Sequence, residues 1–188
     1  MDRGDRERGK AGRCGSPQDG YSRGVRVYIP ATLAMLQQLV TDGSLWPVNG
    51  TAFAVTPSLR EAYAEGDDDE LGEVALRDAA LASLRLLSTA ADELPPRRAV
   101  LVADVENVTL RPELDDAVVR LGGPVAIGDV VAAFVDNAAA EADVTKAIAV
   151  IDEADLGDED AELAVGDAQD HDLAWYATQE LPFLLELL

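Results

Sequence analysis

Histidine and cysteine are almost absent from this sequence. Its 188 residues include one cysteine, Cys14, and one histidine, His171. A single cysteine excludes a disulfide bond within the chain and a zinc site built from several thiolates. A single histidine excludes the catalytic zinc sites that use two or three imidazole ligands. The leading expectation is therefore a protein with no metal and no cofactor.

Long apolar segments are missing as well. No run approaches the ~20 residues that a transmembrane helix needs, and no basic segment leads into an apolar stretch of the signal-peptide type. With 48% hydrophobic residues, the chain can still bury a core of its own. These features predict a soluble, cytoplasmic protein of one domain that has no membrane partner.

Basic side chains are scarce. The chain has 15 Lys and Arg residues against 36 Asp and Glu residues, for a formal net charge of −21. Residues 1–26 carry +3, so residues 27–188 carry −24. Such a negative body repels phosphate backbones, and we expect no nucleic acid to bind through it. Solubility explains the acidity most simply, while a basic protein partner, mimicry of a nucleic acid and cation binding are open alternatives.

Several motifs that would indicate an enzyme class are absent. The chain has no Walker-type phosphate loop, no G-x-G-x-x-G and no G-x-S-x-G. The acidic segment between Asp152 and Asp172 is not an EF-hand. A loop that begins at Asp152 with Gly157 as its glycine has Ala154 and Leu156 at two ligand positions.

Residues 1–24 are rich in glycine and arginine and poor in apolar side chains. We expect this segment to be a disordered basic leader, because it cannot bury enough surface to offset the entropy of ordering. One alternative is an arginine-rich arm that contacts RNA or an acidic surface. Another is that the start was assigned too far upstream and that the protein begins near Val25.

Residues 25–42 predict a strand that leads directly into a helix. Apolar and polar residues alternate from Val25 to Ile29, as in a pleated strand. Pro30 should end the strand ladder, and Thr32 should cap the helix. Gly43 fits the left-handed position that follows many helices. This unit marks the start of the folded domain.

Further elements follow from periodicity and from turn residues. We expect a small mixed β-sheet with helices packed on it, in a single α/β or α+β domain over residues 25–188. Glu73 and Arg77 should form an ion pair across one helical turn. The predicted elements are a strand at 52–55, a helix opened by Thr56 and Pro57, a long helix at 71–87 preceded by four acids, a buried strand at 98–105, a strand or short helix at 117–121, a strand at 132–136, a helix at 138–155, and an apolar C-terminal segment that docks on the domain.

The strongest candidate for proton chemistry is the triplet Asp170, His171 and Asp172. A carboxylate beside an imidazole can orient it as a general base, and His171 is the side chain that titrates nearest to neutral pH. A structural role for His171, such as a hydrogen bond that fixes the C-terminal element, is the competing interpretation.

Asp104 and Glu106 form a second candidate pair at the end of the predicted buried strand. In α/β sheets ligands bind beyond the carboxyl ends of strands, so these two acids could hold Mg²⁺ or act as acid and base. They could equally be ordinary loop residues. The aromatic residues Tyr28, Trp46, Tyr63, Trp175 and Tyr176 could likewise line a pocket or fill the core.

Three stretches carry a resemblance to a known family. They read VRVYIPATL at residues 25–33, TAFAVTPSLRE at 51–61 and DHDLAWYATQEL at 170–181. Over about residues 25–181 the chain resembles a family of uncharacterised actinobacterial proteins, a domain of unknown function. The resemblance implies a folded region that begins near Val25 and implies no activity, cofactor or partner.

We therefore predict a non-enzymatic acidic protein that binds or regulates, with a basic protein as its partner. The alternative is a metal-dependent hydrolase or transferase that uses Asp104, Glu106 and the 170–172 triplet. That alternative requires Asp104 or Glu106 within about 6 Å of the triplet in a concave pocket.

Overall fold

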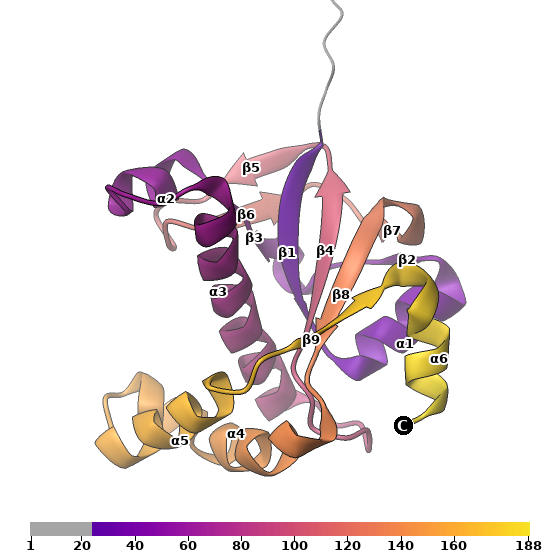
Figure 1. Ribbon diagram of the computed structural model, residues 1–188, viewed down its shortest axis with the longest axis vertical. Helices are drawn as coiled ribbons and strands as arrows, with labels where there is room; N and C mark the ends of the chain where they lie inside the picture. The colour runs from indigo at the N-terminus through magenta and orange to yellow at the C-terminus, as the bar shows by residue number, and fades with distance from the viewer. Residues whose placement is uncertain (1–23) are drawn as a thin grey trace, which may run out of the picture.

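The computed structural model describes residues 24–188, so the predicted disordered leader lies outside the described residues except for Gly24. The fold is a seven-stranded antiparallel sheet with helices on both faces, together with a two-stranded sheet of β2 and β7 (Figure 1). Its strand order is β5-β6-β3-β1-β4-β8-β9. None of the helices between residues 24 and 188 has the length and apolar composition needed to cross a bilayer.

The predicted class, a sheet with packed helices, is confirmed. Where the sequence suggested a mixed sheet, every strand pair within residues 24–188 is antiparallel. The strands are β1 (Val25–Ala31), β2 (Ser44–Leu45), β3 (Thr51–Phe53), β4 (Ala99–Val105), β5 (Val108–Leu110), β6 (Val118–Leu121), β7 (Val125–Ala126), β8 (Val130–Val135) and β9 (Ala174–Ala177).

The opening unit folds as the sequence predicts, with one correction. Thr32 caps α1 (Leu33–Asp42) by accepting a hydrogen bond from the Met35 N–H, and Gly43 takes the left-handed conformation after it. Pro30 does not end the ladder, because β1 continues to Ala31 and Pro30 faces Val100 of β4. On its other side β1 pairs with β3 only at Tyr28, so the missing N–H of Pro30 removes no ladder bond there.

One face of the sheet is covered by α3 (Asp68–Thr89), which packs on β1, β3 and β4. Asp67 caps this helix, and Glu70 completes a capping box by accepting from the Asp67 N–H, so the predicted role of these acids at a helix start is confirmed. The small residues Ala75 and Ala79 let the helix lie close to the sheet. The short α2 (Pro57–Ala62), capped by Thr56 as predicted, covers the β6 side of the same face.

The opposite face is covered by α1 and by α6 (Leu181–Glu186), which lie beside each other in Figure 1. Leu36 and Leu39 of α1 share the main core with Leu181 and Leu184 of α6. The prediction that the apolar C-terminus docks against the opening unit is therefore confirmed. Of the two alternatives left open for residues 117–121, a strand or a short helix, the structure has the strand, because residues 118–121 form β6.

Two further helices close one end of the sheet. They are α4 (Glu141–Asp155), which the sequence predicted, and α5 (Glu159–Gln169), which it did not. The two helices pack on each other and on the C-terminal half of α3 (Figure 1). The chain then leaves α5, turns at His171 and enters β9.

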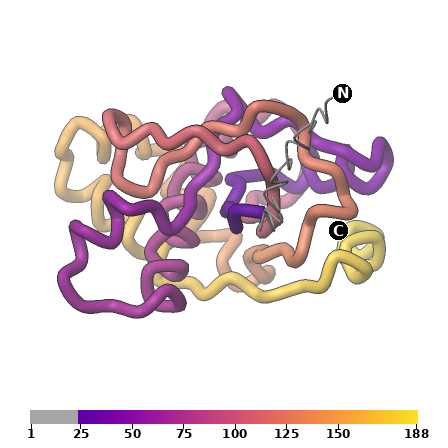
Figure 2. Tube along the Cα trace, turned by 90° about the horizontal axis from the view of Figure 1, so that it is seen from above, coloured from indigo at the N-terminus to yellow at the C-terminus, as the bar shows by residue number. Residues whose placement is uncertain are grey.

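The placement of α3 leaves part of one sheet face uncovered. In the described part of the chain α3 contacts mainly β1, β3 and β4, so the same side of β8 and β9 carries little helix cover, and β9 is an edge strand. Figure 2 shows the segment from α5 to α6 running along one side of the molecule. The uncovered strip is two strands wide, about 10 Å at ~4.8 Å between strands.

Candidate functional site

The uncovered strip and the flank of α3 form a groove. Two adjoining pockets of about 620 Å³ and about 550 Å³ run along it, and both are lined by Glu73, Leu76 and Phe134. We call this surface the α3 groove. Its α3 wall consists of Asp68, Asp69, Gly72, Glu73, Leu76, Arg77 and Ala80, and its floor includes Ala132, Phe134 and Trp175.

The floor of the α3 groove is apolar and aromatic. Phe134 of β8 and Trp175 of β9 are directly opposed in the antiparallel register, so their side chains lie on the same face. Phe134 is partly buried against the core under α3, whereas Trp175 is 59% exposed. An indole that exposed above an apolar floor is a typical element of a protein contact surface.

The rim of the α3 groove is acidic. Asp69 and Glu73 are exposed on the α3 wall, and Asp170 and Asp172 are exposed at the end of the groove nearest α5. Within residues 24–188 none of these four carboxylates has an ion-pair partner. The rim therefore presents negative charge that a partner can neutralise.

The basic side chains of the groove are mostly occupied. The Arg26 guanidinium donates two hydrogen bonds to the Asp104 carboxylate, and Arg60 Nη2 lies 3.0 Å from Asp68 Oδ1. Arg77 also lines the groove, but the predicted Glu73–Arg77 ion pair is not formed. Both residues are exposed, and an exposed ion pair contributes little to stability.

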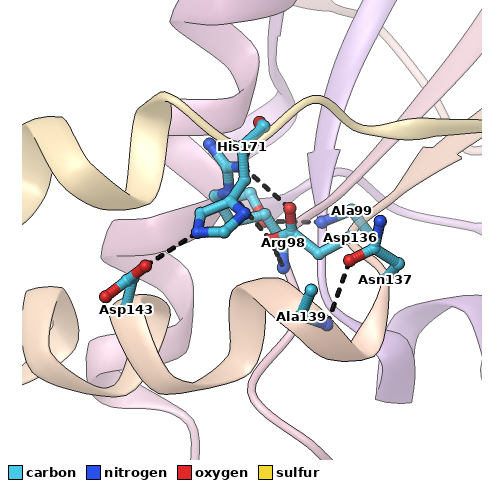
Figure 3. Close-up of polar contacts among 8 residues, drawn as sticks. Arg98, Ala99, Asp136, Asn137, Ala139, Asp143 and His171 are labelled. Carbon is cyan, nitrogen blue, oxygen red and sulfur yellow. Dashed lines mark hydrogen bonds and ion pairs between the residues drawn. The ribbon is translucent and has the colours of Figure 1, made fainter.

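A buried polar cluster holds the α5 end of the groove in place (Figure 3). Arg98, at the start of β4, is 2% exposed and donates two hydrogen bonds to the carboxylate of Asp136, at the end of β8. The same carboxylate accepts the Arg98 N–H, and Arg98 Nη2 also donates to the His171 carbonyl oxygen at 2.9 Å. One guanidinium thus ties together β4, β8 and the segment that leads into β9.

His171 completes this cluster through its ring. Nε2 lies 2.7 Å from Oδ2 of Asp143 on α4 (Figure 3). The hydrogen bond with His171, together with the charge of Lys146, holds the pKa of Asp143 below its usual value. Within residues 24–188 this is the one hydrogen bond that the His171 ring makes, and no serine or threonine there is bonded to it. The geometry favours the structural interpretation of His171.

The structure separates the sequence-predicted site residues. Asp170, His171 and Asp172 all line the α5 end of the α3 groove. Asp104 lies at the far end of β4 from Arg98, about 20 Å away at ~3.3 Å per residue. Asp104 and Glu106 line a separate pocket at that end of the strand. The concave site that would join both groups of carboxylates is therefore not formed.

Two further observations concern metal ions and perturbed acids. Between residues 24 and 188 no three His, Cys, Asp or Glu side chains are grouped as metal ligands would be.

Burial and the nearby charge of Asp115 raise the pKa of Asp78 to about 6. Asp78 is not among the residues that line the α3 groove, so it adds no chemistry there.

Sequence reasoning missed Arg98, Asp136 and Asp143 as members of one cluster. Arg98 and Asp136 were assigned only to the ends of two predicted strands. The available signal was a charged residue at one end of each of two apolar strands, since an arginine and an aspartate placed there must be paired if both are buried. Trp175 was named as an aromatic residue of either pocket or core, and it belongs to the groove.

Comparison with known sequences adds a family. Residues 25–185 match a family of unknown function, DUF6912. The chain belongs to this family. The DUF6912 match confirms the resemblance to an uncharacterised family, and it begins at Val25, the first residue of β1. No curated protein and no solved structure matches the chain.

Proposed function

We propose that this DUF6912 protein is a non-enzymatic binding protein and that its α3 groove binds a basic protein partner. The observation that carries the proposal is the half-exposed Trp175 above the apolar floor of β8 and β9, beside an acidic rim. An apolar centre surrounded by charge is the usual arrangement of a protein interface.

The charge of the rim supports a basic partner. Asp69, Glu73, Asp170 and Asp172 surround the groove without ion-pair partners in the described part of the chain. A body of −24 attracts a basic partner from a distance and accelerates association. The apolar floor then supplies the short-range contact.

The alternative of a metal-dependent hydrolase or transferase gains no support from the positions of its residues. Asp104 and Glu106 lie at one end of β4, and the 170–172 triplet lies at the other. The His171–Asp143 pair could move a proton, but no nucleophile of the described chain is bonded to it. We therefore retain the binding function.

Affinity capture from cells of the native host tests the proposal. The full-length protein, a Glu73→Lys variant and a Glu153→Lys variant serve as baits. Both substitutions change the net charge equally, but Glu153 is an exposed residue near the end of α4 and lines no part of the groove. We expect a stoichiometric basic protein with the wild type and Glu153→Lys and its loss with Glu73→Lys. Equal recovery with all three baits, or no basic protein with any, contradicts the proposal.

A further inference from the structure

From the shape of the groove we infer that the bound part of the partner is a basic amphipathic α-helix of about three turns, lying beside α3 on β8 and β9. This inference rests on the proposed function and specifies the conformation of the partner segment. The helix would occupy a position on this sheet face where the described chain provides little helix cover.

The width of the strip fits a helix. Two strands span about 10 Å, and a helix with its side chains is about 10–12 Å in diameter. On the neighbouring strands β1, β3 and β4, α3 already covers the sheet in this way. A second helix would extend the existing layer with the same spacing.

The length of the groove sets the length of the helix. Its α3 wall runs from Asp68 to Ala80, about 18 Å at ~1.5 Å per residue. A partner helix of about 12 residues matches that distance. Apolar side chains at the i, i+3, i+4 and i+7 positions would lie on Leu76, Phe134 and Trp175.

The charges of the groove specify the other faces of the helix. Glu73 lies in the middle of the wall and lines both pockets, Asp69 lies toward the start of α3, and Asp170 and Asp172 lie at the α5 end. Lys or Arg side chains that flank the apolar stripe would reach these carboxylates. Partly desolvated pairs of this kind contribute more than surface pairs do.

Addition of an extended strand to β9 fits less well. The edge strand has four residues, Ala174–Ala177. The Ala177 N–H already donates to Glu180 Oε2 at 2.8 Å, so one backbone donor on the open edge is occupied. Short, capped edges discourage strand addition.

A second copy of the chain also fits less well. The α3 groove carries an acidic rim, and each copy has a body of −24. Contact between two such surfaces would place like charges together without partners. Charge therefore favours a different, basic chain.

Fluorescence of Trp175 tests the inference in the full-length protein. The chain has two tryptophans, so Trp46→Phe leaves Trp175 as the only indole. The probes are three tryptophan-free peptides of about 12 residues: a basic amphipathic Leu/Lys helix, the same residues scrambled so that the leucines share no face, and the helix with Glu in place of Lys.

We expect the basic helix to shift the Trp175 emission to shorter wavelength in a saturable way and to gain helical circular dichroism on binding. The scrambled and acidic peptides should bind at least about tenfold more weakly. Glu73→Lys should weaken the basic helix about tenfold, and Glu153→Lys should not.

The outcomes distinguish the helical conformation of the partner segment from the existence of a basic partner. Equal binding of the helical and scrambled basic peptides, with Glu73→Lys weakening both, overturns the helix and leaves the basic partner. A blue-shifted Trp175 in the free protein, with a dimer in sedimentation velocity that Trp175→Ala abolishes, shows that a second copy fills the groove and overturns the inference. Absence of saturable binding by the basic helix overturns it as well, and the capture experiment then decides the proposed function independently.

Discussion

The guanidinium of Arg98 and the carboxylate of Asp136 form a bidentate ion pair in the interior, with 2.8 Å from Nε to Oδ2 and 2.7 Å from Nη2 to Oδ1. The side chains are 2% and 0% exposed. Through its bond to the His171 carbonyl oxygen, Arg98 also positions the segment that leads to β9 and to Trp175. The shape of one end of the α3 groove therefore depends on a buried charge pair.

Asp136→Ala leaves Arg98 charged and unpaired in the interior. We expect a loss of about 3–5 kcal/mol in the free energy of unfolding, measured by urea denaturation. Arg26→Ala, which removes the exposed Arg26–Asp104 pair, is the control and should cost less than about 1 kcal/mol. Equal costs for the two substitutions would contradict a structural role for the buried pair.

Asp143 should titrate below the usual range of an aspartate because His171 bonds to it. His171→Phe removes that bond and should raise the Asp143 pKa toward its usual value, measured by NMR titration of the side-chain carboxyl. Lys146→Ala should raise it less, since Lys146 makes the smaller contribution. A depressed folded-state pKa stabilises the protein above the unfolded-state pKa, and this contribution is lost as the pH falls through the folded value. An unchanged midpoint in His171→Phe would contradict the pairing.

Asp78 should destabilise the protein at neutral pH, because burial and Asp115 raise its pKa to about 6. A raised carboxyl pKa gives its full stabilising contribution below the unfolded-state pKa of about 4, and the contribution is lost as the pH rises through about 6. Asp78→Asn should therefore gain on the order of 1 kcal/mol above pH 6, allowing for partial solvent screening, and lose this advantage toward pH 4.

Denaturation at several pH values measures this difference. Asp152→Asn, at an exposed position on α4, is the control and should change stability little at any pH. A gain of the same size at pH 4 and pH 7 would show that the ionisation of Asp78 is not its source.

Gly72 should tolerate alanine only if Tyr28 loses its hydroxyl. A Cβ at Gly72 would lie 2.8 Å from Tyr28 Oη but 3.8 Å from the ring carbon that bears it. Gly72→Ala should cost about 1–3 kcal/mol from overpacking, less the helical preference of alanine. In a Tyr28→Phe background the same change should be neutral or stabilising by up to about 1 kcal/mol.

A double-mutant cycle measured by chemical denaturation gives the coupling between the two positions. Additive effects would mean that the Tyr28 hydroxyl is not what excludes a side chain at Gly72.

Much of the fold could be predicted because its signals are local. Thr32, Pro57 and the acids at 67–70 stand at the starts of three helices as expected, and each acts within one turn. The run from Ala99 to Val105 indicates a buried strand by composition alone.

The missed helix and the misplaced strand end have physical reasons. The buried side of α5 consists of Ala161, Val165 and Ala168, which are too small to form a clear apolar stripe among so many acids. Pro30 does not end β1 because β3 pairs with β1 only at Tyr28. This pairing joins distant parts of the chain, so the residues around Pro30 alone cannot reveal it.

The site was predictable only in part. His171 and Trp175 could be named from residue type, because each is rare in this chain. Their neighbours depend on strand order: Arg98 meets Asp136 because β4 pairs with β8, and Trp175 faces Phe134 because β8 pairs with β9. Pairings between distant strands are set by the whole sheet, which a single sequence does not specify.

Photo-crosslinking from the floor of the α3 groove in living cells tests the central claim most directly. A benzophenone amino acid replaces Trp175 in the full-length protein in its native host, and the same group replaces Leu163, an exposed residue of α5, as the control. We predict that position 175 crosslinks to a basic protein through a helix-forming segment and that position 163 does not. Crosslinks from position 175 to no protein, to acidic chains, or to the same proteins as position 163 would contradict the account.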